Sequence, residues 1–134
     1  MSQSHLYNEL FFTNVLRILG ERGMTREQLS ELSGVSASLI SDLSRGKGNP
    51  SLRTMGAIAE ALDTALPVLL EATDLGRETL DRLAGDKALT SLPDNYERVT
   101  LILTAFEAFV AKKQDEVNRK KLLEISAKKK SSKP

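Results

Sequence analysis

Residues 24–43 constrain the fold most, because they predict two short helices joined by a very tight turn. Thr25 is followed three residues later by Gln28, the spacing of a capping box that satisfies two backbone N–H groups at a helix start. Gly34 then stands where the chain must turn with a positive φ, which a Cβ disfavours. Ser36 is a second N-cap residue. The sequence therefore predicts helices that begin near residues 26 and 37.

The two predicted helices each have one apolar face. Leu29 and Leu32 are expected to face the core from the first helix, and the second repeats Leu39, Ile40 and Leu43 at helical spacing. The other face of the second helix has small, mostly polar side chains, which are Ala37, Ser38, Ser41 and Asp42. Small side chains let a helix approach base edges in the DNA major groove, so these four are the predicted base contacts. A structural αα-hairpin that never meets DNA is the alternative.

A loop of cations and glycines follows the second helix, with the sequence Arg45-Gly46-Lys47-Gly48-Asn49-Pro50-Ser51. Its proline stops the preceding helix and Ser51 caps the next one. DNA phosphates accept hydrogen bonds from such donors beside a reading helix. The predicted phosphate contacts are Arg26, Arg45, Lys47, Asn49 and Arg53.

A set of residues between about 14 and 72 matches a known pattern. It comprises Leu29, Gly34-Val35-Ser36, Ile40-Ser41, Arg45-Gly46-Lys47, Asn49-Pro50-Ser51 and Ile58-Ala59-Glu60-Ala61-Leu62. On these residues the chain resembles the lambda-repressor/Cro/Xre class of helix-turn-helix transcription regulators. The resemblance implies a five-helix DNA-binding domain. Residues 39–43 and 65–70 also resemble plasmid-borne repressors of the KorC type.

The chain departs from that family at four positions. Arg26 stands where members often carry Gln. Leu19 and Ser44 stand where members often carry an Arg and a Glu that pair, and an apolar contact is expected instead, since burying a charge pair costs free energy. Asp42 stands where members usually carry Gln, Arg or Lys. A carboxylate accepts from cytosine N4 but cannot donate to guanine. The other role open to Asp42 is an internal contact with a cation such as Arg45.

Composition limits the classes of protein that this chain can be. Its 134 residues are 40% hydrophobic, enough for one compact domain and an appendage. It has no cysteine, and neither a signal peptide nor an apolar run of about 18 residues is evident, so a soluble cytoplasmic protein without membrane contact is expected. Residues 1–72 hold six cations against eight acids, but no acid lies between Asp42 and Glu60. A local basic patch is therefore available to nucleic acid.

No pattern of catalytic or metal-binding residues stands out. His5 is the single histidine and has no cluster of ligands at metal-binding spacing. No strand is predicted that would hold a glycine-rich phosphate loop. We expect no catalytic residues, no metal, no cofactor and no enzyme activity, and no small-molecule effector is evident.

Further helices are predicted on both sides of the motif. The first begins at Leu6 and ends near Gly20, and its aromatic extension over residues 5–12 is either additional core or a partner surface. Later helices are predicted from Ser51 to Leu62, over residues 66–70, and over residues 75–83. The last of these is expected to be capped by Thr73 or Asp74 and stopped by Gly85.

The C-terminal part is predicted to be a long helix from Pro93 to at least Ala111. Apolar residues at alternating steps of three and four form a seam that packs helix on helix, and they are Tyr96, Val99, Leu103, Phe106 and Val110. Pairing in a homodimer is favoured over folding back onto the domain. Residues 112–134 hold nine cations and three acids, and residues 128–134 are expected to be a disordered tail that either solubilises the protein or contacts phosphates.

The expected protein is all-α, with a five-helix lambda-repressor-like DNA-binding domain over residues 1–72. A helical dimerisation region over residues 73–111 contains a short helix and the long dimerisation helix, and residues 112–134 form a basic helix end and tail. The function that follows is a sequence-specific transcriptional repressor, a homodimer that occludes a promoter at a palindromic operator. The alternatives are the antitoxin of a toxin–antitoxin pair and a protein-interaction adaptor that does not bind DNA.

Overall fold

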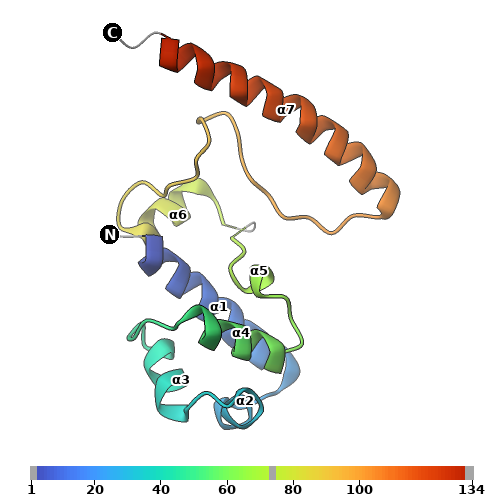
Figure 1. Ribbon diagram of the computed structural model, residues 1–134. Helices are drawn as coiled ribbons and strands as arrows, with labels where there is room; N and C mark the ends of the chain where they lie inside the picture. The colour runs from blue at the N-terminus through green and yellow to red at the C-terminus, as the bar shows by residue number, and fades with distance from the viewer. Residues whose placement is uncertain (1–2, 73–74, 132–134) are drawn as a thin grey trace. The chain divides into compact units, whose positions relative to one another are not determined.

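Seven α-helices run through the residues that the structure describes, 3–72 and 75–131, in a computed structural model of the chain (Figure 1). In chain order they are α1 (Gln3–Arg22), α2 (Arg26–Ser33), α3 (Ala37–Ser44), α4 (Leu52–Ala61), α5 (Leu66–Leu69), α6 (Arg77–Ala84) and α7 (Ala105–Ser131). No strand occurs within these residues, which confirms the all-α fold class. The chain divides into two compact units, Met1–Thr100 and Leu101–Pro134.

Side-chain caps fix the starts of α2 and α3. Gln28 N donates to Thr25 Oγ1 at 3.1 Å and Thr25 N donates to Gln28 Oε1 at 2.8 Å, so both halves of the capping box are present. Ser36 Oγ accepts from Leu39 N at 3.1 Å. Between the two helices Gly34 ends α2 in the left-handed conformation, with a φ of 74°. The predicted pair of helices and its tight turn are confirmed.

One large apolar cluster forms the core of α1 to α5. It consists of Phe11, Phe12, Val15, Ile18, Leu19, Leu29, Val35, Ile40, Leu43, Ile58, Ala59, Leu62 and Leu69. Leu29 is fully buried, but the prediction for Leu32 is wrong, because its side chain is 63% exposed. The short helix α2 packs against α3 and α4 through the face that carries Leu29. A step of three residues rotates Leu32 by about 60° away from that face.

The N-terminal extension of α1 is part of the core rather than a bare partner surface. Phe11 and Phe12 are buried in the large cluster. Leu6 and Leu10 form a second cluster with Ala84 and Ala88, which packs α1 against α6. The first compact unit therefore continues past residue 72, where the sequence placed the end of the domain, and it reaches Thr100.

A polar side chain holds α1 against α5, and a left-handed glycine ends α6. Asn14 Nδ2 donates to Leu69 O at 2.9 Å and to Glu71 O at 3.2 Å, which holds α1 against the end of α5. The helix predicted over residues 75–83 is α6, and Gly85 ends it with a φ of 76° as expected. Thr73 and Asp74, its predicted caps, lie outside the described residues, and α6 begins after Gly76 without a side-chain cap.

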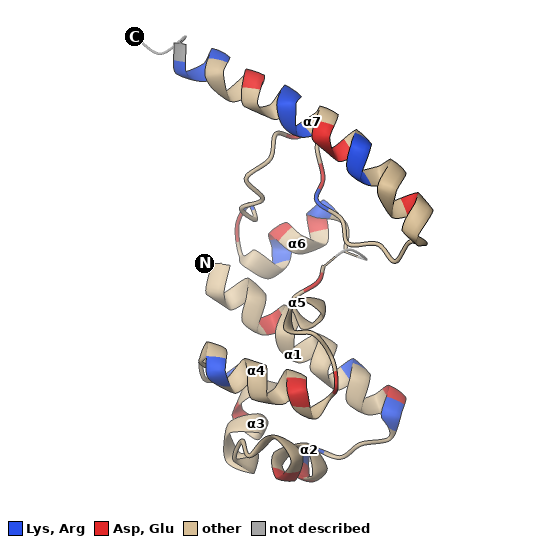
Figure 2. Ribbon diagram, turned by 45° about the vertical axis from the view of Figure 1, so that its right-hand side comes forward, with Lys and Arg blue, Asp and Glu red and all other residues tan. Residues whose placement is uncertain are grey.

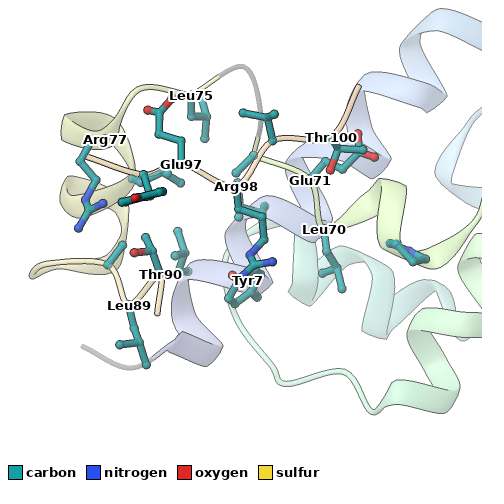
Figure 3. Close-up of a pocket in the computed structure, with 18 residues that line it drawn as sticks. Tyr7, Leu70, Glu71, Leu75, Arg77, Leu89, Thr90, Glu97, Arg98 and Thr100 are labelled. Carbon is teal, nitrogen blue, oxygen red and sulfur yellow. The ribbon is translucent and has the colours of Figure 1, made fainter. Parts of the chain in front are cut away.

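A cavity of about 280 Å³ lies beside the extension of α1 (Figure 3). Leu6, Leu10, Leu70 and Leu80 give it apolar walls, and residues 96–100 form another side. The Arg98 side chain points toward Tyr7 in this view. Tyr7 is 40% exposed, so it is the part of the aromatic extension that the core leaves accessible.

The long C-terminal helix starts later than predicted. Residues 95–104 are neither helix nor strand, and α7 begins at Ala105, so the prediction of a helix from Pro93 is wrong. Thr104 and Glu107 explain the start, because Glu107 N donates to Thr104 Oγ1 at 3.3 Å and Thr104 N donates to Glu107 Oε1 at 3.4 Å. This is a second capping box, which holds the chain out of the helix before Thr104.

The basic end of the chain is helical as far as it is described. α7 continues through Lys128, Lys129 and Lys130 to Ser131, so the disordered tail predicted from residue 128 is wrong for these residues. Cations in the last turn of a helix interact favourably with its macrodipole. Along the helix Arg119 Nε lies 2.7 Å from Asp115 Oδ2, an i,i+4 ion pair. Residues 132–134 lie outside the described residues.

Replacing Gly34 with Ala is expected to destabilise the protein by about 1 to 2 kcal/mol, because a Cβ disfavours the left-handed conformation. No atom lies within 4 Å of the added Cβ, so the cost comes from the backbone alone. Gly20→Ala is the matched control, since its Cβ also meets no atom within 4 Å but the residue is helical. That change is expected to stabilise the protein by about 0.5 to 1 kcal/mol. Urea unfolding followed by circular dichroism measures both, and equal midpoints for the two variants would contradict the turn.

Candidate nucleic-acid interface

One face of α3 is buried and the opposite face reaches the surface. Ile40 and Leu43 lie in the core, and Leu39 is half-buried against it. Ala37 and Ser38 are exposed in the first turn, directly after the Ser36 cap. Ser41 and Asp42 are half-buried one turn later. The structure therefore brings the four predicted base contacts to one side of α3, where side chains are short enough for the backbone to approach a groove.

Asp42 makes the internal contact that the sequence analysis left open. Its Oδ1 atom lies 3.0 Å from Arg45 Nη2, and both side chains are partly exposed. The Asp42 carbonyl also accepts from Arg45 N at 3.1 Å and from Lys47 N at 2.8 Å, which folds the loop against the end of α3. The ion pair neutralises the carboxylate that stands on the reading face. Arg45 retains further N–H donors for a phosphate, because its guanidinium carries five.

Arg26 links the two helices of the motif, a contact that sequence reasoning missed. Its Nη1 atom donates to Ser44 Oγ at 2.9 Å, and Ser44 Oγ donates to Ser41 O at 2.6 Å. The prediction of an apolar contact in place of the family's ion pair is therefore wrong at Ser44, which is held by hydrogen bonds. Leu19, at the other position of that pair, is buried in the core. Arg26 and Ser44 were both visible in sequence as departures from the family, but the contact between them was not. Arg26 joins the start of α2 to the end of α3.

The loop between α3 and α4 presents further donors, and Figure 2 shows the cations of this region in blue. Lys47, Asn49 and Arg53 are all exposed. Pro50 is buried, and Ser51 caps α4 by accepting from Thr54 N at 3.1 Å. The N-terminus of a helix favours anions because its first N–H groups point outward. The loop and the first turn of α4 therefore carry exposed phosphate donors just after the end of α3.

Glu9 is a second neighbour of the loop that sequence reasoning missed. A Cβ added to Gly46 would lie 3.3 Å from Glu9 Oε1, so this carboxylate of α1 sits against the loop backbone. A small cavity of about 70 Å³ lies between α1 and the loop, bordered by Glu9, Gly46 and Lys47. Glycine is favoured at residue 46 by this close approach of Glu9 and also by its φ of 72°, because a Cβ disfavours a positive φ. No sequence signal connects Glu9 with a loop so far along the chain.

The five predicted dimer residues do not share one helix. Phe106 and Val110 lie on α7, and both are exposed. Val99 and Leu103 are exposed in the segment before α7, and Tyr96 borders the larger cavity. The helical seam as predicted is therefore wrong, although four of its five residues remain accessible to a partner.

Metal-binding and membrane-spanning features are also absent from the part of the chain that the structure describes. No group of three or more His, Cys, Asp or Glu side chains among residues 3–72 and 75–131 is placed to hold a metal ion. No helix in those same ranges has the length and hydropathy needed to cross a bilayer.

Comparison with known proteins finds one matching family model and several relatives. The model, described as helix-turn-helix, matches residues 15–69. An uncharacterized HTH-type transcriptional regulator, y4dJ of Sinorhizobium fredii, is 35% identical over 66 residues, which are 49% of this chain and 86% of the relative. Control protein C.SmaI of Serratia marcescens is 33% identical over 52% of this chain and 83% of its own length. The immunity repressor protein of Bacillus phage phi105 is 38% identical over 45% of this chain and 38% of its own length.

Replacing Asp42 with Asn is expected to strengthen binding to DNA of random sequence by roughly fivefold, equivalent to about 1 kcal/mol. The change removes a negative charge from the reading face and releases Arg45 for phosphates. Glu21→Gln is the matched control, because Glu21 forms an exposed pair with Arg17 at the same distance of 3.0 Å on α1. Fluorescence anisotropy with a labelled random duplex measures both variants. Equal gains would show that net charge, and not this position, determines the effect.

Proposed function

Because this chain belongs to the helix-turn-helix family of the Xre and lambda-repressor type, whose members are DNA-binding regulators rather than enzymes, we propose that it represses transcription by binding a specific operator. The observation that carries the proposal is the surface of α3. Its first turn places Ala37 and Ser38 in solvent, and the loop that follows the helix carries the exposed donors Lys47 and Asn49. A short polar helix face with a border of phosphate donors suits the major groove.

In the proposed complex, α3 lies in the major groove and its neighbours hold it there. Ala37, Ser38 and Ser41 approach base edges, and Asp42 accepts from cytosine with its second carboxylate oxygen while Arg45 holds the first. The backbone contacts come from Arg26, Arg45, Lys47, Asn49 and Arg53. Arg26 has a double role, because its bond to Ser44 fixes the angle between α2 and α3. Phosphate contacts position the helix, and base contacts select the sequence.

Repression by occlusion is the mechanism that requires the fewest contacts from this protein, because DNA binding alone is sufficient. A regulator that covers promoter DNA excludes polymerase without a further activating contact. The name of one relative, an immunity repressor, supports this direction of control. We propose a homodimer on a palindromic operator, since two-fold symmetry in the protein matches two half-sites about 34 to 36 Å apart. The antitoxin and adaptor alternatives, like the KorC-type resemblance, stay predictions.

Selection of bound duplexes from a random library, followed by footprinting upstream of the protein's own gene, tests the proposal. We expect an inverted repeat whose half-site centres are about one helical turn apart. The affinity for DNA should fall steeply between low and moderate salt. Binding releases salt cations condensed on the phosphates, and this release becomes less favourable as the salt concentration rises. An adaptor would retain no DNA at any salt, and an antitoxin would require a bound protein before it protects its operator.

Ser38→Ala is expected to cost about 1 to 3 kcal/mol on the selected operator and little on random DNA, because a base contact is lost. Lys47→Ala is the comparison variant, expected to weaken binding to both DNAs alike and to reduce the salt slope by about one unit. Anisotropy titrations at several salt concentrations separate the two patterns. If Ser38→Ala weakens both DNAs equally, then this residue only positions the protein.

A further inference from the structure

The second compact unit has no core of its own. Every residue of its described part, 101–130, is at least partly exposed. Its exposed large apolar side chains are Leu101, Ile102, Leu103, Phe106, Phe109, Val110, Val117 and Leu123. A helix in a folded protein gains most of its stability by packing an apolar face against other elements. A surface with this many exposed apolar side chains marks an interaction site. The unit therefore requires something to pack against.

The segment before α7 is neither helix nor strand in the structure, but it has the composition of a β-strand. Residues 98–104 read Arg-Val-Thr-Leu-Ile-Leu-Thr, in which β-branched residues favour extended backbone. In an extended chain alternate side chains share a face, which places Val99, Leu101 and Leu103 together. Ile102 on the other face is 103% exposed, as open as a side chain in an unfolded peptide. The capping box at Thr104 prevents α7 from growing back into this segment.

We propose that this segment pairs with the same segment of a second copy, as two antiparallel strands centred on Leu101. In this register Leu101 stands opposite its own copy, Val99 opposite Leu103, and Thr100 opposite Ile102. The pattern is self-complementary, as a two-fold interface requires, because each contact occurs twice. It places three aliphatic side chains from each copy on one face of the ribbon. The inference rests on the homodimer of the proposed function and gives it an interface based on strand pairing.

The charges and apolar residues of α7 also fit a second copy. Phe106, Phe109, Val110 and Val117 recur at helical spacing on one face of its N-terminal half, so they extend the apolar surface of the ribbon. Residues 105–117 hold two cations and three acids, whereas residues 118–131 hold six cations and one acid. Parallel α7 helices would bring the two basic halves together. Antiparallel helices place each basic half beside the more acidic half of its partner. The helices would then run antiparallel, as the proposed strands do.

Single cysteines test the register, because the sequence has no cysteine. Leu101→Cys is expected to form a disulfide-linked dimer under mild oxidation, since directly opposite residues lie about 4.5 to 5.5 Å apart between Cα atoms, within disulfide reach. Ile102→Cys is the control, because it meets its own copy only diagonally, at about 7 to 8 Å. The cross-linking rate should differ at least tenfold. A mixture of Val99→Cys with Leu103→Cys should cross-link between the two variants, and neither alone.

Proline substitutions test whether the backbone takes part. In an antiparallel pair the N–H groups of consecutive residues point alternately toward and away from the partner strand. Leu101→Pro and Ile102→Pro should therefore differ strongly, at least tenfold in the dimer dissociation constant from sedimentation. Leu101→Ala and Ile102→Ala, which keep the N–H, are the controls for loss of the side chain. If each proline variant weakens the dimer no more than its alanine counterpart, strand pairing is overturned.

The outcomes separate this inference from the DNA-binding proposal. A dimer in sedimentation that cross-links through Phe106→Cys or Val110→Cys but not through Leu101→Cys would overturn the strand register and leave the dimer intact. A protein that sediments as a monomer while it occupies its operator would overturn both the register and the dimer. Failure of the unmodified protein to select any DNA sequence would overturn the proposed function, whatever the cross-links show.

Discussion

Burial of Ile40 and Leu43 determines which face of α3 meets solvent, and every feature of the candidate interface depends on that orientation. These side chains pack into the cluster that Leu29 and α1 complete, at a gain of about 1.5 to 3 kcal/mol for each large aliphatic. Rotating α3 to expose them would forfeit that gain and bury Ser38, a hydroxyl without a partner in the core. The polar face is therefore held outward by hydrophobic packing on the opposite side, and the reading surface needs no contact of its own to be stable.

Local signals in the sequence were enough to predict the motif and its neighbours. Thr25, Ser36 and Ser51 each place a side-chain oxygen at a helix start, a contact made within three residues. Gly34 and Gly85 each end a helix with a positive φ, again a property of one residue. Leu32 shows the limit of such reasoning, because its exposure depends on which neighbours α2 contacts and not on its own spacing. The contacts of Arg26 with Ser44 and of Glu9 with the Gly46 loop are tertiary, so no local pattern announced them.

The C-terminal part shows a conflict between two sequence patterns. Apolar steps of three and four predicted a helix from Pro93, although Val99 and Ile102 in that stretch are β-branched. Such residues lose side-chain freedom in a helix, which lowers its stability at each position. The sequence Thr104-Ala105-Phe106-Glu107 also matches the capping box that correctly predicted α2. A rule that served at residue 25 was therefore available at residue 104, and applying it there would have placed the start of the helix correctly.

The irregular chain after α6 is attached to α1 and α6 by several contacts. Ala88 is buried against Leu6 and Leu10 of α1, and its N–H donates to Asp81 Oδ1 at 2.7 Å. Asp81 is itself held by Arg77 Nε at 3.5 Å. Tyr96 and Val99 then border the cavity on α1, and this helix also packs against α3. Strand pairing beyond Thr100 would consequently act on residues already attached to the first unit. Since α1 contacts both α3 and α6, the spacing of the two reading heads in the proposed homodimer would depend on this one helix more than on the length of the loop.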